Sequence, residues 1–323
     1  MTLSPPLFGR AQNKKSQLSL GLRLGSQQFS LACLQAQPES PLLQRVHTEA
    51  TSGLEDFSQK LTRLVDQWQL HGEIARVVLN NDLYRLLQAD TPNVPEPERD
   101  AALAWSLKDV LDFPATEAVI SSFLPPVSPR GGNERLFVAA AHKAKIRPYV
   151  EKIAAAGLKL DTIDIPELCA RNLLMKLNPP IPSIAMLVQS GRGAVIYVFH
   201  DNELVISRPL AGIGDMAVLF SGYENRQLMD QLVLEIQRTL DFYESQIGRR
   251  PIGKLVLPPL PDELTPLPEF LRQNLNVALL SLDIAALLPT DESIDKTALP
   301  QAWLAVGAAL RELPVAEVQR ATG

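Results

Sequence analysis

Two glycine turns are the places in this sequence where the backbone could hold a phosphate group. The first contains Arg23, Gly25 and Ser26 and follows an alternating apolar strand, and the second contains Gln189 and Gly191. Backbone N–H groups converge at such turns and make them anion-binding sites. An arginine beside a turn can also pair with phosphate directly. Each turn is therefore either a phosphate site or only a connection between strands.

Two pairs of charged residues are also candidates for a functional role. Glu235 and Arg238 lie three positions apart on a predicted helix, where an intrahelical ion pair is the favoured interpretation. Asp161 and Asp164 have the spacing of paired acids for general acid–base catalysis. The favoured alternative is that Asp164 caps a helix that begins near Pro166, because Asp is a preferred capping residue.

Three glycines outside the turns have both a structural and a functional interpretation. Gly212 and Gly214 either line a cleft or serve a loop between a strand and a helix. Gly307 lies inside a predicted helix, where glycine costs about 1 kcal/mol relative to alanine. We expect Gly307 to allow a close approach of two backbones.

Composition excludes several classes of function. The net charge of −5 argues against a nucleic-acid partner. The longest apolar stretch, residues 276–288, is interrupted by Asp283 and is shorter than the roughly 20 residues of a membrane helix, so we expect a soluble protein. Cys33 and Cys169 are expected to be buried thiols. The four histidines lie far apart without ligand spacing, which predicts that no metal is bound.

The elements that position these residues follow from periodicity. Period-two alternation predicts a hairpin over residues 20–34 and a third strand over 42–50. An amphipathic helix is predicted over 53–70 and a short buried strand over 75–81. Together these elements predict the first half of an α/β unit.

The second half of the sequence repeats this order. Three strands are predicted over residues 183–212, a long helix over 226–248 and a strand over 253–260. A strand, helix and strand over 135–165 lie between the two halves and are expected to form a small inserted subdomain. The repetition predicts a duplicated architecture with a cleft between two lobes.

Four stretches resemble the PilM family of type IV pilus assembly proteins, in particular its MshI branch, associated with mannose-sensitive haemagglutinin (MSHA) pili. They occur in the order of the family, and the first is specific to that branch. The stretches are "YRLLQADTPNVPEPERDAALAWSLKDVLDFP", "RLFVAAAHKAKIRPYVEKIAAAGLKLDTIDIPELCARNLL", "LVLEIQRTLDFYESQ" and "AVGAALRE".

The resemblance implies an α/β chain with the actin-like ATPase fold of FtsA and PilM. Two lobes of mixed sheet and helices would carry a small inserted strand–helix–strand subdomain. The implied domains are a disordered tail (1–16), a first lobe (17–98, completed by a C-terminal helix, 300–313), the inserted subdomain (99–165) and a second lobe (166–299).

The resemblance also implies a nucleotide cleft that is degenerate in this chain. The acids that orient hydrated Mg²⁺ in the family correspond to Arg23 and Gln189, and two later glycines correspond to Pro258 and Pro259. We therefore assign no catalytic residue, no metal and no cofactor, although ATP binding stays open. The positions that match the cleft are Arg23, Gly25, Ser26, Gln189, Gly191, Gly212, Glu235, Arg238 and Gly307.

For function, the resemblance implies a cytoplasmic scaffold of the pilus assembly complex that is held at the inner membrane by its partners. It would bind the short N-terminal peptide of a PilN-like membrane protein between the first lobe and the inserted subdomain. Trp105, Lys108 and Phe113 are the candidate contacts, although Trp105 could equally belong to the core. No nucleic-acid partner is expected, and homo-oligomer formation stays open. The alternative is an active ATPase whose nucleotide state controls partner binding.

Overall fold

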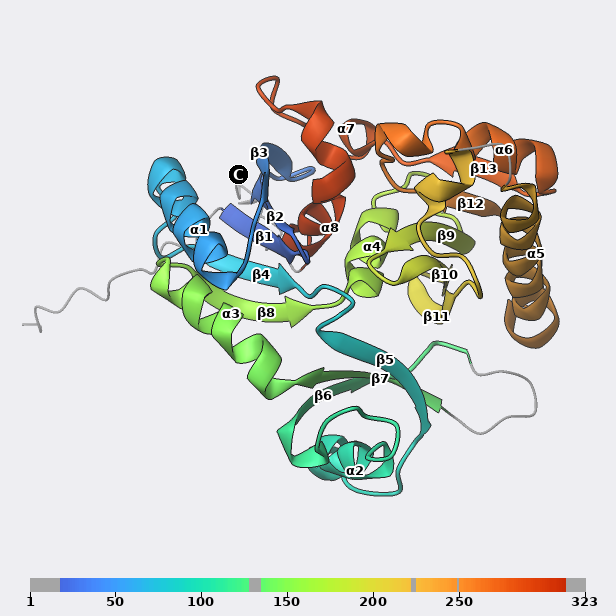
Figure 1. Cartoon of the computed structure of the whole chain (residues 1–323), viewed down its shortest axis with the longest axis horizontal. Coiled ribbons are helices and arrows are strands. Elements are labelled where there is room, and N and C mark those ends of the chain that lie inside the picture. The colour runs from blue at the N-terminus through green and yellow to red at the C-terminus, as the bar shows by residue number, and fades with distance from the viewer. Residues whose placement is uncertain (1–17, 128–134, 222–224, 249, 312–323) are drawn as a thin grey trace, which may run out of the picture.

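The chain folds into two lobes side by side, with a smaller subdomain below the region where the lobes meet (Figure 1). The computed structural model describes residues 18–127, 135–221, 225–248 and 250–311. Each lobe contains a five-stranded mixed sheet, and the subdomain contains three antiparallel strands. The predicted two-lobed α/β architecture is therefore confirmed.

The sheet of the first lobe has the strand order β3-β2-β1-β4-β8. The first three strands are antiparallel, whereas β4 runs parallel to β1 and β8 runs parallel to β4. The strands are β1 (Leu18–Leu24), β2 (Gln28–Gln35), β3 (Leu42–Ala50), β4 (Ile74–Val78) and β8 (Lys159–Asp164). The predicted hairpin is β1 and β2, joined by the turn at Gly25.

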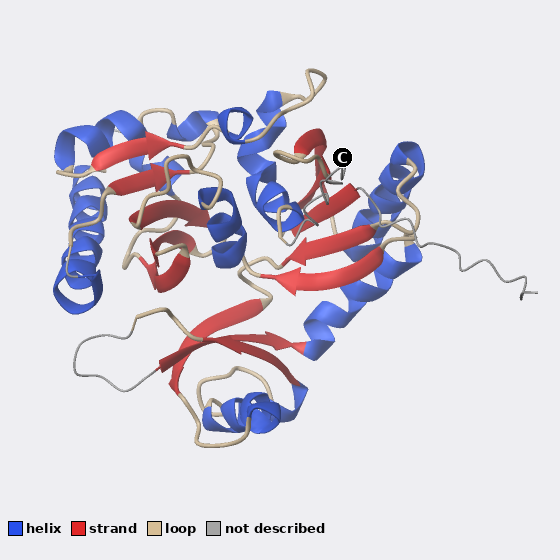
Figure 2. Ribbon diagram, turned by 180° about the vertical axis from the view of Figure 1, so that it is seen from behind, coloured by secondary structure: helices blue, strands red, loops and turns tan. Residues whose placement is uncertain are grey.

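Helices cover both faces of this sheet (Figure 2). One face packs on α1 (Leu54–Trp68) and α3 (Lys143–Ala155), because alternate side chains such as Leu31 join the same apolar cluster as Phe57. The other face packs on α8 (Leu299–Ala309). A Cβ at Gly21 of β1 would overlap the carbonyl oxygen of Ala305, so this glycine lets α8 lie directly on the strand.

The second lobe repeats this arrangement, with the strand order β11-β10-β9-β12-β13. Again three antiparallel strands are followed by two parallel ones. The strands are β9 (Ser183–Ser190), β10 (Gly193–His200), β11 (Glu203–Pro209), β12 (Lys254–Leu257) and β13 (Ala278–Ser281). The predicted repetition of the first half in the second is thus present in the sheet topology.

The helices of the second lobe also lie on both faces of its sheet. Residues of β10 with even numbers, such as Ile196, pack with α5 (Arg226–Tyr243) and α6 (Leu267–Asn274). Residues with odd numbers, such as Tyr197, pack with α4 (Pro166–Leu174). The helical turn α7 (Ile284–Leu287) follows β13 and belongs to this second cluster.

The small subdomain has different boundaries from those predicted. Its sheet has the order β5-β7-β6, and its members are β5 (Tyr84–Asp90), β6 (Ala118–Phe123) and β7 (Arg135–His142), with α2 (Arg99–Ser106) packed on one face. The prediction placed residues 84–90 in the first lobe and residues 143–165 in the insert. Both placements are wrong, because β5 pairs with β7, whereas β8 pairs with β4 and α3 packs beside α1.

The helices α4 and α8 lie against each other between the two sheets (Figure 1). Their apolar side chains share one cluster with residues of both lobes, so this pair forms the core that connects the lobes. The predicted C-terminal helix does complete the first lobe, but it ends at Ala309. The predicted positions 312–313 and the predicted tail 1–16 lie outside the described residues.

Short turns of 3-10 helix complete the described elements. They cover Glu96–Glu98, Ala115–Glu117, Met216–Phe220, Asp262–Leu264 and Lys296–Ala298, and a π-helical turn covers Glu244–Gly248. Across the described ranges, no helix combines the length and the apolar character that crossing a bilayer requires.

Candidate functional site

Arg23, beside the first glycine turn, forms a hydrogen bond with a backbone carbonyl group and not with a carboxylate. Nη1 of Arg23 donates to the carbonyl oxygen of Gln301 at 3.1 Å, and Oγ of Ser30 donates to the same oxygen at 3.1 Å. Burial lowers the pKa of the Arg23 guanidinium. In the described part of the chain Arg23 forms no ion pair. Its contact therefore fixes the start of α8 beside the end of β1.

The turn itself is closed by its own backbone. The N–H of Gly25 donates to the carbonyl oxygen of Gln28 at 2.8 Å, and a Cβ at Gly25 would lie 2.6 Å from that oxygen. Ser26, at the tip, is exposed. Gly25 is therefore required by the hairpin whether or not a phosphate binds there.

The second glycine turn uses its glutamine to hold a loop. Oε1 of Gln189 accepts the N–H of Met216 at 2.9 Å, and Nε2 of Gln189 donates to the carbonyl oxygen of Ser190 at 2.9 Å. A carboxylate at this position could orient the waters of a metal ion, whereas this amide is occupied by backbone groups. Gln189 is therefore a structural connection between β9 and the loop before Met216–Phe220.

The same turn reaches the first lobe. Nε of Arg192 lies 3.4 Å from Oδ1 of Asp82, and a Cβ at Gly191 would lie 3.5 Å from Oδ1 of Asn80. Asn80 and Asp82 belong to the loop between β4 and β5. The second turn therefore lies at the junction of the lobes.

Glu235 of α5 is buried and carries two arginine partners. Its Oε1 pairs with Nη1 of Arg238 at 2.6 Å, which is the intrahelical ion pair favoured from the sequence, and its Oε2 pairs with Nη2 of Arg208 at 3.0 Å. Arg208 comes from β11, so the pair also ties α5 to the sheet. Gly212, the next predicted residue, has a φ of 75°, and Nε2 of Gln231 on α5 packs against it.

Gly307 packs against the backbone of α4. A Cβ at this position would overlap the carbonyl oxygen of Cys169, and Nδ2 of Asn172 donates to the carbonyl oxygen of Gly307 at 2.9 Å. The glycine therefore lies at the contact between α4 and α8, which agrees with the close backbone approach expected from the sequence. Its assignment to the cofactor cleft stays a prediction.

The pair Asp161 and Asp164 is divided between two different partners. Oδ2 of Asp164 pairs with Nη1 of Arg311 at 2.8 Å, whereas Oδ2 of Asp161 lies 3.4 Å from Nε of Arg76. The helix α4 begins after Ile165 without a side-chain cap, so the prediction that Asp164 caps it is wrong. Asp164 is almost fully buried, and the arginine at the end of α8 neutralises it.

Sequence reasoning missed a polar cluster between the small subdomain and the second lobe. Glu167, in the first turn of α4, accepts hydrogen bonds from the hydroxyl of Tyr84 at 2.7 Å and from Oγ of Ser207 at 3.1 Å. Burial raises the pKa of the Glu167 carboxyl, even though both hydroxyl groups donate to it. Burial and the neighbouring Glu167 also raise the pKa of Tyr84. These three residues, each at least 40 positions from the next, thus form one hydrogen-bonded cluster. No local sequence pattern predicts this cluster.

This cluster forms one wall of a cavity of about 220 Å³. The other walls include Asn81 from the first lobe and Ser190 and Arg192 from the second glycine turn. The cavity therefore lies where the two lobes and the small subdomain meet.

The predicted partner contacts lie in two different surroundings. Trp105 of α2 is 62% exposed, which excludes the alternative that it belongs to the core. Phe113 is half-buried and stacks on His142, with 4.8 Å between ring centroids. A shallow depression between the small subdomain and α3 is lined by Phe113, His142 and Lys145 among others, but by neither Trp105 nor Lys108. The three residues therefore lie on one subdomain but do not form a single pocket.

Comparison with known proteins identifies the fold. No family model and no curated protein matches the sequence. Among solved structures, the chain is similar to one described as a PilM–PilN type IV pilus biogenesis complex, with 19% identity over 91% of this chain and 98% of that chain and a TM-score of 0.69. The chain therefore has the actin-like fold expected from the resemblance.

Two more distant similarities accompany this one. The cytoplasmic domain of EpsL, an inner-membrane component of the type II secretion system of Vibrio cholerae, is 13% identical over 90% of this chain and 93% of its own, with a TM-score of 0.45. A Bacteroides thetaiotaomicron protein with an actin-like ATPase fold is 12% identical over 84% and 94%, with a TM-score of 0.48.

Proposed function

We propose that this chain is a non-catalytic, actin-like adaptor of a type IV pilus assembly complex. It binds the cytoplasmic N-terminal peptide of a PilN-like inner-membrane protein and is thereby held at the cytoplasmic face of that membrane. The observation that carries the proposal is the similarity to the PilM–PilN complex along 98% of the solved chain. The branch-specific stretch at residues 84–114 supports an assignment to MSHA pili.

The geometry of both glycine turns supports a role without catalysis. Arg23 bonds to the backbone of α8, and Gln189 bonds to the backbone of its neighbouring loop. Neither side chain is a carboxylate that could orient the water shell of Mg²⁺. An adaptor needs no metal, because recognition of a short peptide requires a groove, apolar pockets and an accessible strand edge.

The small subdomain offers such a strand edge. β6 is one of the two edge strands of the sheet β5-β7-β6, and Val119 on this strand is exposed. An extended peptide can add to an edge strand through main-chain hydrogen bonds while its side chains fill neighbouring pockets. We therefore place the peptide along the small subdomain, with Trp105 and Phe113 as apolar contacts.

Cationic side chains next to this edge favour a peptide that carries acidic residues. Lys143, Lys145 and Arg147 begin α3 directly after β7, and all three are exposed. Within the described residues none of them forms an ion pair. Charge complementarity of this kind mainly increases the association rate and the specificity of binding.

A labelled peptide tests the proposal. Its sequence is the cytoplasmic N-terminus of the PilN-like protein encoded in the same genome, and fluorescence anisotropy measures binding to the full chain. We expect saturable binding at micromolar concentrations that W105A weakens about tenfold, because truncation of a buried aromatic contact typically costs 1–2 kcal/mol or more. The matched control is F242A, which removes another exposed aromatic side chain from α5 of the second lobe.

Two results would contradict the proposal. Absence of saturable binding at high micromolar concentrations would exclude this peptide as the partner. Equal effects of W105A and F242A would show that the peptide does not recognise the small subdomain.

A further inference from the structure

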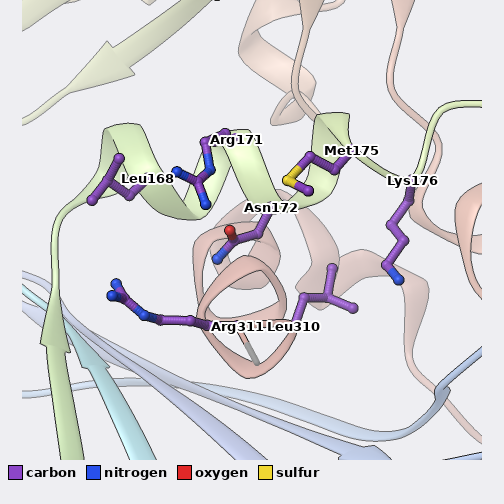
Figure 3. A pocket seen from close by; sticks show the side chains of 7 residues that line it. All are labelled: Leu168, Arg171, Asn172, Met175, Lys176, Leu310 and Arg311. Carbon is purple, nitrogen blue, oxygen red and sulfur yellow. The ribbon is translucent and has the colours of Figure 1, made fainter. Parts of the chain in front are cut away.

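A second cavity lies between α4 and the end of α8, and it is lined by cations. Its volume is about 340 Å³. Figure 3 shows Arg171, Asn172 and Lys176 extending from α4 and the turn after it toward the end of α8, which carries Arg311. None of the proposed cleft residues Arg23, Gly25, Gln189 and Gly191 belongs to its described lining.

The charge of this lining is one-sided. Of the described residues that face the cavity, three are cationic and none carries a carboxylate. Arg171 uses Nη1 to pair with Oε2 of Glu203 at 2.8 Å, while its Nε is buried without a hydrogen-bond partner. Lys176 is exposed and takes part in no ion pair of the described residues. The cavity therefore has hydrogen-bond donors that the chain itself does not fully use.

The remaining walls are apolar or neutral. Leu168 and Met175 from the α4 segment and Leu310 from the end of α8 are its apolar residues, and Asn172 adds an amide. Cavities of roughly 300 to 1,000 Å³ with a few placed polar groups are typical of small-molecule sites. Four of the seven described residues that line this cavity are polar, and three are apolar. Guanidinium groups and ammonium groups are the side chains that bind phosphate best.

We propose that this cavity binds a phosphate-bearing small molecule. Arg171 and Lys176 contact the phosphate, and Met175 and Leu310 pack against the remainder of the ligand. The site is separate from the glycine turns and does not depend on the adaptor role.

The position of the site between segments of both lobes allows a bound ligand to affect how the two lobes are arranged. Arg171 is bonded to Glu203 of β11 in the second lobe, and Arg311 is bonded to Asp164 of β8 in the first lobe. A ligand that contacts Arg171 and packs on Leu310, the neighbour of Arg311, therefore touches segments tied to both lobes. Binding stabilises the lobe arrangement that places these cations together, because a ligand favours the conformation to which it binds more tightly.

Calorimetric titration with sodium pyrophosphate at constant ionic strength tests the proposal on the full chain. We expect saturable binding with a Kd below about 1 mM. K176E weakens this binding by about tenfold or more, because it removes a charged hydrogen bond and adds a repulsive charge. The matched control K296E makes the same charge change at an exposed lysine near the other end of α8, and we expect it to leave the Kd unchanged within about twofold.

A third variant distinguishes this cavity from the glycine turns. S26E places a negative charge at the exposed tip of the first turn and should not affect pyrophosphate binding. Loss of binding in S26E but not in K176E would place the anion at the turn and overturn the proposal. Equal weakening by K176E and K296E, or no saturable binding below about 10 mM, would overturn it as well.

Discussion

Gly307 of α8 faces the carbonyl oxygen of Cys169 of α4 so closely that a Cβ at position 307 would overlap that oxygen. The contact joins the two helices that lie between the sheets of the two lobes. A residue that looks unfavourable within a helix is therefore required by the packing of the molecule.

This contact predicts that G307A destabilises the fold. Alanine favours the helix by about 1 kcal/mol, but overpacking typically costs about 1–3 kcal/mol, and here the obstacle is backbone that cannot rotate away. We expect a net loss of about 1–2 kcal/mol in urea denaturation. G214A is the control, because a Cβ at Gly214 meets nothing within 4 Å. A G307A variant as stable as the wild type would show that the helices separate easily.

The contact between Arg311 and Asp164 predicts a second loss of stability. The Asp164 side chain is only 1% exposed, so removal of its partner in R311A leaves a buried charge. Breaking a buried pair in this way typically costs about 3 kcal/mol or more. The exposed pair of Arg272 and Glu269 provides the control, since R272A should change the stability by about 0–1 kcal/mol. If D164N restores the stability of R311A, the unpaired charge is the cause.

Glu167 predicts a dependence of stability on pH. Burial raises the pKa of its carboxyl, so the folded chain keeps this proton at a higher pH than the unfolded chain does. The stabilisation by this proton is complete below the unfolded pKa of about 4.3 and is lost as the pH rises through the folded pKa. E167Q stays neutral, and its amide oxygen can still accept the Tyr84 hydroxyl. We therefore expect E167Q to gain stability relative to the wild type as the pH rises above about 4.

Urea denaturation at several pH values measures this difference. The control is E151Q, which changes an exposed carboxylate on α3 and should show no comparable trend. A difference between E167Q and the wild type that stays constant with pH would contradict a raised pKa of Glu167 in the folded chain.

The proposed absence of catalysis predicts the response to nucleotide. Where the resemblance places two acids that orient hydrated Mg²⁺, this chain has Arg23 and Gln189, so Mg-ATP should raise the thermal midpoint no further than ATP with EDTA does. A functional site occupied at one hundred times its Kd would instead stabilise the fold by about 2.7 kcal/mol. ATP with EDTA is the control that separates nucleotide binding from a metal-dependent effect. A magnesium-dependent rise of several degrees would favour the active ATPase.

Local pattern was sufficient to predict the elements that surround the two turns. Apolar residues located β1, β2, β9 and β10, because strands whose two faces are both covered are buried over nearly their whole length. The ion pair of Glu235 and Arg238 was also predictable, since residues three apart on a helix are neighbours. These features depend only on residues that are close in the chain.

The boundaries of the small subdomain could not be predicted in this way. β5 is only seven residues long and follows β4 closely, so its sequence neighbours suggest the first lobe. Its partner β7 begins 45 residues later. Strand pairing over such a distance depends on the tertiary arrangement and leaves no local signal.

The sequence by itself determined the two-fold order of strands and helices and the positions of the two glycine turns. Only the tertiary structure decided what those positions contact. Arg23 donates a hydrogen bond to the carbonyl oxygen of Gln301, and Gln189 accepts one from the N–H of Met216. Gly307 packs against the backbone of α4. The tertiary structure also assembled Glu167 with Tyr84 and Ser207, and it gathered Arg171, Lys176 and Arg311 around one cavity. The physical reason is that periodicity fixes the direction in which a side chain points, whereas its partner depends on which distant element packs there.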